Sequence, residues 1–131
     1  PFRPLLPDVR LIEFNNENTK GKIVILKCWF IACKTCVAEF PQLNELKEKY
    51  KNRNDMVFVS LAFDAKNDLE LFLQKKPFSY SVIPDQKQFM SDVLDLTSYP
   101  THIIIDQNGK IRKVVHTADE MISTLENDIL P

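Results

Sequence analysis

The stretch KCWFIACKTCVAEFP, residues 27–41, holds all three cysteines of the chain, and two of them, Cys33 and Cys36, are separated by only two residues. Residues 23–30, IVILKCWF, overlap the start of this stretch and form a nearly continuous apolar run. Such a run is typical of a strand that is buried on both faces of a parallel sheet. From Cys33 onward apolar residues recur at spacings of three to four, the period of an amphipathic helix. These residues are Val37, Phe40, Leu43, Leu46 and Tyr50. The cysteine pair is therefore expected where a strand gives way to a helix.

The segments outside this stretch predict an α/β domain in which strands and helices alternate. The expected order is β, β, α, β, α, short α, β, β, α, which gives a mixed sheet with helices on both faces. Two capping boxes are expected, at Asn67 with Glu70 and at Thr117 with Glu120, and a tight reversal at Asn108 and Gly109. The expected strands cover 9–14, 23–30, 56–63 and the two arms of the hairpin at 101–115, and the expected helices cover 33–50, 67–76, 86–94 and 117–130.

Length and charge narrow the class of protein. The chain has 131 residues, 44% of them hydrophobic, with 17 basic and 18 acidic residues and a net charge of −1. We expect one domain over residues 8–131, preceded by an extended arm or linker at 1–7. We also expect the protein to be a monomer. No basic stripe suggests a nucleic-acid or membrane-surface partner. The chain begins at Pro1 without a leader, so we interpret it as a mature form or excised piece whose export signal is not visible.

The position of Cys33 favours a reactive thiolate. A sulfur at the start of a helix faces free backbone N–H groups and the positive end of the helix dipole, which lowers a thiol pKa from about 8.5 to roughly 3.5–7.5. Lys34 next to it adds to the same field. Cys36 is one turn further into the helix and should be shielded, within disulfide reach of Cys33. This asymmetry predicts Cys33 as the nucleophile and Cys36 as the resolving cysteine.

Alternative roles for the cysteines fit the sequence less well. A zinc site would need Cys33 and Cys36 with His102 and His116, which lack metal-type spacing, so no metal is expected. A structural staple is unattractive because the loop is so short, and a relic pair on a domain that only binds partners stays open. Cys28, in mid-strand between apolar residues, is interpreted as a small core residue.

The motif resembles that of a known family. The stretch GKIVILKCWFIACKTCVAEFPQL, residues 21–43, is similar to the thioredoxin superfamily and within it to the TlpA/ResA-like extracytoplasmic thiol:disulfide oxidoreductases, an AhpC/TSA-related group. Matching features continue with Asp64, PFSYSVIPD at 77–85, YPT at 99–101 and IIIDQNGKI at 103–111. The resemblance covers nearly the whole chain beyond residue 7 and implies a thioredoxin-like fold.

The resemblance implies further site residues. Pro100 would follow a cis peptide bond opposite the dithiol, where the backbone around Tyr99 and Thr101 pairs with an incoming peptide, and Pro41 would kink the first helix. Trp29, kept from the family pattern, would lie beside the active site and take part in binding partners. The central Lys34-Thr35 dipeptide would help to set the reduction potential and contact partners. Two departures from the family pattern matter. Ala32 replaces the usual tryptophan, which bears on partner choice, and this dipeptide replaces a proline-containing centre, which bears on the reduction potential.

Two charged residues near the cysteines suggest a buried pair. The resemblance places Glu39 near the dithiol, where it would relay protons or tune the cysteine pKa values, although a solvated helix carboxylate is the simpler alternative. Strand alternation puts Lys27 on the same face as Ile25 and Trp29, so its amine must find a partner or lose its proton. We hypothesise that Lys27 pairs with Glu39 beneath the dithiol; the alternative is a lysine that extends to solvent.

The sequence therefore predicts protein thiol:disulfide exchange, with no metal or organic cofactor. The resemblance implies a reductant outside the cytoplasm, in the periplasm and held near the membrane, recharged by a membrane thiol donor and serving cytochrome c maturation. A thiol peroxidase is a weaker alternative because no Thr-x-x-Cys attacker is present. A thioredoxin-like binding domain of a larger protein is the other alternative.

Overall fold

The centre of the fold is a pair of parallel strands that lead to the cysteines. The structure is a computed structural model that describes residues 20–131, so the arm expected at 1–7 and the strand expected at 9–14 lie outside the described residues. β1 (Ile23–Trp29) is buried at every position, as its apolar sequence predicts. β2 (Met56–Ala62) pairs with it in parallel over its full length. The order strand, helix, strand predicts this parallel pairing, and the structure confirms it.

Among the described residues the sheet is mixed and has five strands, in the order β3-β2-β1-β4-β5. β3 (Ser81–Ile83) pairs in parallel with β2, whereas β4 (Thr101–Ile105) runs antiparallel to β1 and β5 (Ile111–Val115) antiparallel to β4. The hairpin was expected, but β3 was not, because three residues are too few for a clear alternation of apolar and polar positions. β1 and β4 lie side by side at the centre and carry the site described below.

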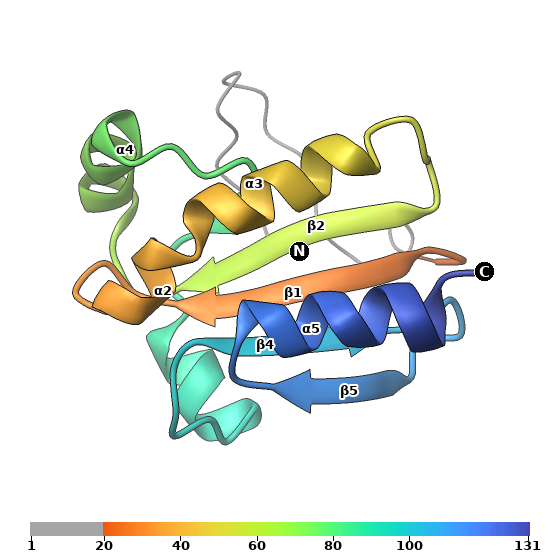
Figure 1. Ribbon diagram of the computed structural model, residues 1–131. Helices are drawn as coiled ribbons and strands as arrows, with labels where there is room; N and C mark the ends of the chain where they lie inside the picture. Colours follow the sequence, from red (N-terminus) through yellow and green to blue (C-terminus); the bar gives the residue numbers. More distant parts are fainter. Residues whose placement is uncertain (1–19) are drawn as a thin grey trace.

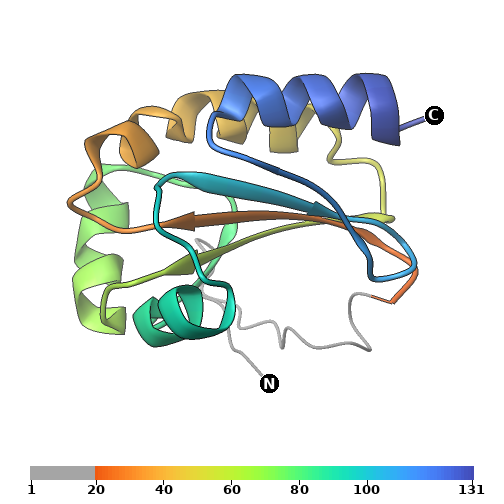
Figure 2. The same cartoon turned by 90° about the horizontal axis from the view of Figure 1, so that it is seen from below.

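Helices flank both faces of the sheet (Figure 1 and Figure 2). α2 (Lys34–Ala38), α3 (Phe40–Lys49) and α5 (Ala118–Thr124), which continues into η2 (Leu125–Ile129), lie on one face. The short π-helical turn η1 (Phe89–Val93) lies on the opposite face, and α4 (Lys66–Lys75) lies beyond the end of β2. Within residues 20–131, no helix combines the length and apolar character needed to cross a bilayer.

The main core fills the space between the sheet and the α3 and α5 helices. At its centre the Trp29 ring meets Phe40 edge-on at 5.0 Å, and Phe40 stacks on Phe78 at 4.1 Å. Leu43 and Met121 add the apolar faces of α3 and α5, and each of these two side chains is fully buried. Burial of a side chain of this size contributes about 1.5–3 kcal/mol, so this cluster supplies a rigid base for the residues above it.

The helix expected after the cysteines is two helices. Glu39 ends α2 and begins α3, and Pro41 falls in the first turn of α3 rather than in mid-helix. A proline is tolerated there because the first backbone N–H groups of a helix have no partner within the helix. The interruption lies directly before Pro41, so the expected effect of this proline on the helix is observed, as a division into two helices rather than a kink within one. The junction matters because it turns the Glu39 side chain toward the sheet.

Two other local predictions need correction and one is confirmed. Thr117 caps α5, with its Oγ accepting the Glu120 N–H at 3.1 Å, as expected. The cap expected at Asn67 is wrong, since Ala65 precedes α4 and no side chain caps it. At the hairpin turn only Gly109 of the expected pair has a positive φ, +80°, so the turn is not the two-residue reversal that was expected.

The hairpin turn is instead held by Asp106, which immediately follows β4. Its Oδ1 accepts the backbone N–H groups of Asn108 at 2.9 Å and Lys110 at 3.0 Å. These hydrogen bonds hold the pKa of Asp106 below its usual value, against the opposing effect of burial, with the charges of Arg112 and Lys110 adding to the lowering. The turn lies at the opposite end of β4 from the cysteines.

Candidate active site

The two cysteines form a disulfide at the start of α2. Cys33 and Cys36 are bonded, with their Cα atoms 5.3 Å apart. Cys33 is the N-cap of α2, and its Sγ accepts the Cys36 N–H at 3.2 Å. Cys33 is 9% exposed and Cys36 is fully buried, which is the asymmetry that the sequence predicted. Donors aimed at the Cys33 sulfur stabilise a thiolate there after reduction.

The loop that carries Cys33 is anchored to the neighbouring strand. Asp64, directly beyond the end of β2, accepts the Ile31 N–H through Oδ2 at 2.8 Å, and the Cys33 N–H donates to the Phe30 carbonyl at 3.1 Å. The Phe30 ring stacks on Phe63 with ring centres 4.7 Å apart. In the sequence, Asp64 is recognisable only as a residue that matches the family pattern. These contacts fix the approach to the disulfide from β1.

The loop before β4 adds the proline that the resemblance implied. The Tyr99–Pro100 peptide bond is cis, which confirms that expectation. The Tyr99 ring meets Phe63 edge-on at 5.0 Å, so this loop packs against the loop that follows β2. Thr101 is buried and donates its hydroxyl to the Ser98 carbonyl at 2.5 Å. A role for Tyr99, Pro100 and Thr101 in partner binding stays a prediction.

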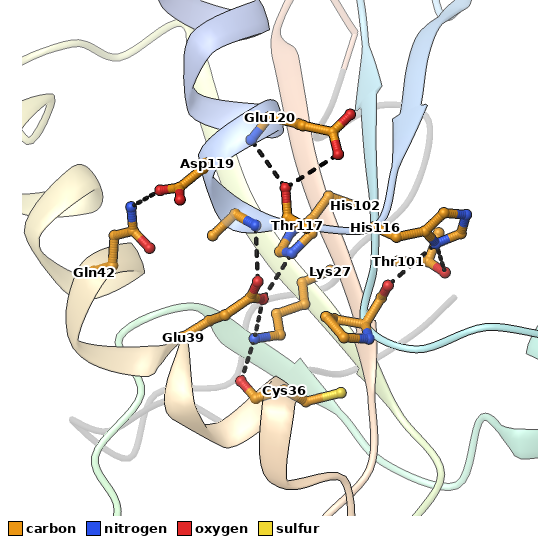
Figure 3. A network of polar contacts seen from close by, with 12 residues as sticks. Lys27, Cys36, Glu39, Gln42, Thr101, His102, His116, Thr117, Asp119 and Glu120 are labelled. Carbon is orange, nitrogen blue, oxygen red and sulfur yellow. Dashed lines mark hydrogen bonds and ion pairs between the residues drawn. The ribbon is translucent and has the colours of Figure 1, made fainter.

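Lys27 is buried beneath the disulfide and paired. Its side chain is fully buried, and Nζ donates to the Cys36 carbonyl at 2.5 Å and to Glu39 Oε1 at 3.2 Å (Figure 3). Nζ also lies over the rings of Phe40, at 5.1 Å, and Phe78, at 5.4 Å, which favours a cation there. The predicted contact with Glu39 is thus confirmed, and the alternative of a lysine extended to solvent is wrong.

Glu39 has more partners than the sequence indicated. Its Oε1 also contacts His102 Nε2 at 2.8 Å (Figure 3). Its Oε2 accepts the Ala118 N–H at 2.7 Å. The partners come from β1, β4 and the start of α5, so this carboxylate joins three elements. The sequence suggested His102 only as a possible metal ligand, although Lys27 and His102 are opposite each other in the β1–β4 register. Knowledge of that register would have revealed the contact.

The network shifts two pKa values. Burial lowers the pKa of Lys27 to about 8, although the charge and hydrogen bond of Glu39 oppose that effect. For Glu39, burial raises the pKa, but the hydrogen bond and charge of His102, the charge of Lys27 and the Ala118 N–H outweigh it. The pKa of Glu39 is therefore below its usual value, and an ionised carboxylate faces a cation beneath the dithiol.

The remaining predicted site residues differ in accessibility. Lys34 and Thr35 are exposed beside the disulfide, where a partner protein would reach them. Trp29 is fully buried and donates from Nε1 to Ser60 Oγ at 3.1 Å, which argues against the predicted contact with partners and favours a packing role. Cys28 is a free, buried thiol whose pKa burial raises to about 12, in line with its interpretation as a core residue.

No group of three or more His, Cys, Asp or Glu side chains is arranged to hold a metal ion within the part of the chain that the structure describes. His102 faces Glu39, whereas His116 Nδ1 lies 3.3 Å from both Thr101 Oγ1 and the Pro100 carbonyl oxygen. The two histidines therefore have separate partners. Neither joins the cysteines in the four-ligand arrangement that a zinc site would require.

Comparisons with known proteins agree with this geometry. The Redoxin family model matches residues 3–129. Thiol-disulfide oxidoreductase ResA of Geobacillus thermodenitrificans is 26% identical over 111 residues, which cover 85% of this chain and 64% of that protein. The chain thus spans somewhat less than two thirds of the length of that relative.

Solved structures show the same fold. A crystal structure of a candidate thiol:disulfide interchange protein DsbE from Chlorobium tepidum superposes with a TM-score of 0.76 at 27% identity, covering 98% of this chain and 91% of that one. The exposed lipoprotein thioredoxin Etrx1 of Streptococcus pneumoniae gives a TM-score of 0.74 at 21% identity, covering 95% of this chain and 97% of that one. The α/β thioredoxin-like fold, with its mixed sheet, is confirmed.

Proposed function

This chain belongs to the Redoxin family, and on that basis we propose that it is a thiol:disulfide oxidoreductase that exchanges its Cys33–Cys36 pair with protein partners, as a reductant. The observation that carries the proposal is the unequal exposure of the two bonded cysteines, 9% for Cys33 and 0% for Cys36. A partner reaches only one of the two sulfurs. Exchange chemistry needs this order of attack and release.

The first step is attack by Cys33. In the reduced protein its thiolate, stabilised by the Cys36 N–H, attacks one sulfur of a partner disulfide. A bond forms between Cys33 and that sulfur, while the partner's own S–S bond breaks and its second sulfur leaves as a thiolate. The partner is then held through a mixed disulfide, with its chain near Tyr99 and Thr101.

The second step is release by Cys36. Its thiol loses a proton and attacks Cys33, so the Cys33–Cys36 bond forms and the bond to the partner breaks. The departing partner sulfur takes up a proton, and two electrons have passed from the dithiol to the partner. Lys27 contacts the Cys36 carbonyl, so its positive charge lies next to the residue that must ionise. We assign the Lys27–Glu39 pair to this ionisation.

The partners follow from the same geometry. The exposed Lys34 and Thr35, together with the loop at Tyr99 and Pro100, would contact an extended partner segment that contains the disulfide. The family resemblance favours apocytochrome c, whose paired cysteines must be reduced before haem attachment, and a membrane thiol donor that restores the dithiol. A peptide with an oxidised Cys-x-x-Cys-His sequence, the haem-attachment pattern, should be reduced faster than oxidised glutathione. Equal rates would argue against this partner class.

We place the protein outside the cytoplasm. The support is the resemblance to extracytoplasmic relatives, together with the likeness to an exposed lipoprotein thioredoxin. In intact cells that produce the full-length protein, a membrane-impermeant thiol reagent should label Cys33 after reduction. Labelling that appears only after lysis would instead indicate a cytoplasmic protein.

Reduction of insulin by dithiothreitol tests the activity. The protein should accelerate it, Cys33→Ser should abolish the acceleration, and Cys28→Ala serves as the matched control because that thiol is buried and takes no part in the disulfide. An inactive wild-type protein that still binds partners would support a binding domain instead. Rapid turnover of hydrogen peroxide without insulin reduction would indicate a peroxidase.

The reduction potential tests the direction of electron flow. Equilibration of the Cys33–Cys36 pair with glutathione buffers should give a value near the roughly −270 mV of thioredoxin. A value near the about −120 mV of the oxidant DsbA would overturn the assignment as a reductant while leaving disulfide exchange intact.

A further inference from the structure

The Glu39 carboxylate has an unusually complete set of donors for a side chain with so little solvent access. It is 12% exposed, and its two oxygens receive Lys27 at 3.2 Å, His102 at 2.8 Å and the Ala118 N–H at 2.7 Å. A buried carboxylate with these donors stays ionised, because each one favours the charged form. The shortest contact from a side chain is that of His102, which the mechanism above does not use.

Among the described residues, the His102 side chain makes its hydrogen bond to Glu39 and to no other residue. Its side chain is fully buried in β4, and its Nδ1 atom is buried without a hydrogen-bond partner among the described residues. An imidazole with one orphaned nitrogen is costly to bury, so such groups in native structures call for an explanation. Within residues 20–131, the Nε2 contact to Glu39 is the hydrogen bond that orients this ring.

The charge of Glu39 affects the dithiol through Lys27. Lys27 has a carboxylate, the Cys36 carbonyl and two aromatic rings as its surroundings, so Glu39 is its only counter-charge among these contacts. If the carboxylate became protonated or turned away, a buried cation would be left unpaired and would tend to lose its proton. The positive charge next to Cys36 would then be lost.

We propose that His102 is a positioning residue for the resolving step: by donating from Nε2 to Glu39 it keeps the carboxylate ionised and directed at Lys27, which holds a cation against Cys36. This inference rests on the proposed function and extends it to a residue on another strand. The lowered pKa of Glu39, to which His102 contributes, agrees with it. No bond is made or broken at His102.

Other ionisable groups face this network and bear on its pH dependence. The Tyr80 hydroxyl is buried without a partner among the described residues, and its pKa is raised by burial and further by the charge of Glu39, so it stays neutral. His116, just beyond β5, contacts Thr101 rather than Glu39. Asp119, in the first turn of α5, accepts from Gln42 at 2.7 Å. In the part of the chain that the structure describes, the ionisable groups in direct contact with Glu39 are thus Lys27 and His102.

A small aromatic disulfide, dithiobis(nitrobenzoate), separates the two steps without a protein partner. Reduced Cys33 attacks the reagent, keeps one half of it in a mixed disulfide and releases the other half as a coloured thiolate. Cys36 then loses its proton, attacks Cys33 and displaces the bound half as a second coloured thiolate. Stopped-flow absorbance gives a fast and a slow phase, and the pH profile of the slow phase reports the apparent pKa of Cys36. Cys28 is buried and should not contribute.

His102→Leu should slow the second phase about tenfold at pH 7 and raise its apparent pKa by about one unit, since one pKa unit corresponds to a factor of ten. The first phase should change less than about threefold, because Cys33 does not contact this network. His102→Gln places an amide donor near the position of Nε2 and should restore most of the rate of the second phase. His102→Asn, which is too short to reach Glu39, should resemble His102→Leu and serves if the leucine variant does not fold.

Asp106→Asn, at the other end of β4, is the matched control because it weakens the hairpin turn without touching the network. An unchanged slow phase in His102→Leu and His102→Asn would overturn the proposal, as would equal slowing in His102→Gln or in Asp106→Asn. If the wild-type protein gives two phases but fails to reduce insulin, the proposed activity fails while this inference stands.

Discussion

Two carboxylates in this protein have similar partners but opposite surroundings. Glu39 accepts from Lys27 and contacts His102, and Glu126 in η2 accepts from Lys49 at 2.5 Å and from the Tyr50 hydroxyl. The lysine side chain is fully buried in the first group and 60% exposed in the second. The comparison therefore isolates the effect of burial on one kind of ion pair.

The two lysines respond in opposite directions. Burial lowers the pKa of Lys27 to about 8 in spite of Glu39, whereas the hydrogen bond that Lys49 donates to Glu126 raises the pKa of Lys49 against the opposing effect of burial. Desolvation of a charge inside a protein outweighs its attraction to one partner, but at the surface it does not. The same kind of ion pair is thus removed from solvent beneath the dithiol and exposed to it on α3 and η2.

The largest effect is expected from removing the buried carboxylate. Glu39→Leu leaves Lys27 without its counter-charge and both His102 and the Ala118 N–H without an acceptor. We expect the free energy of unfolding at pH 7 to fall by about 3–5 kcal/mol, the usual effect of breaking a buried ion pair. Urea denaturation of the oxidised protein measures it.

Two further variants sharpen that result. The double variant Lys27→Met with Glu39→Leu removes the unpaired cation and should recover part of the lost stability. Glu126→Leu is the matched change at the surface and should lose far less. Equal destabilisation in Glu39→Leu and Glu126→Leu would mean that burial does not distinguish the two groups.

A smaller effect is expected from raising the pH. The pKa of Lys27 is about 8 in the folded protein against an ordinary 10.5, so between these values the unfolded chain binds more protons. Stability contributed by Lys27 therefore rises with pH over this window, by on the order of 3 kcal/mol in total. Urea denaturation from about pH 7 to 11 should show a larger rise in the free energy of unfolding for the wild-type protein than for Lys27→Met. The variant keeps the other titrating groups, so the difference between the two proteins reports Lys27. Parallel curves for the two proteins would contradict the lowered pKa.

The smallest effect is expected at the surface pair. Glu126→Gln removes the charge that faces Lys49 but keeps a polar side chain, and an exposed pair contributes little to stability. The loss in free energy of unfolding should be marginal at low salt and should disappear in about 1 M salt, where the Debye length is about 3 Å. A large loss that persists in high salt would show that this pair behaves like the buried one.

One half of the buried network was predictable from the sequence. Strand alternation placed Lys27 on the face that carries Trp29, and the family resemblance placed Glu39 near the dithiol, so their contact could be expected. His102 was missed because its contact with Glu39 spans 63 residues and depends on the antiparallel register of β1 and β4. Local periodicity carries no information about register between distant strands.

The same limit explains the errors in the fold. Apolar periodicity correctly gave the parallel pair, the hairpin and the helices, because each buries one continuous stripe. The periodicity predicted one helix in place of α2 and α3 because the apolar positions keep their helical spacing on both sides of Glu39. The break is evident only from the backbone geometry at Glu39, which ends α2 and begins α3. β3 has three residues, so its identity comes from pairing with β2 rather than from its own pattern.

Every step of the proposed exchange depends on Cys33, and not Cys36, attacking the partner. Reduced Cys36→Ser mixed with oxidised insulin should accumulate a mixed disulfide, and mass spectrometry of the peptides should place the link at Cys33. Cys33→Ser treated in the same way should form none. A link at Cys36 of comparable yield in Cys33→Ser, or no link in either variant, would contradict this order of attack.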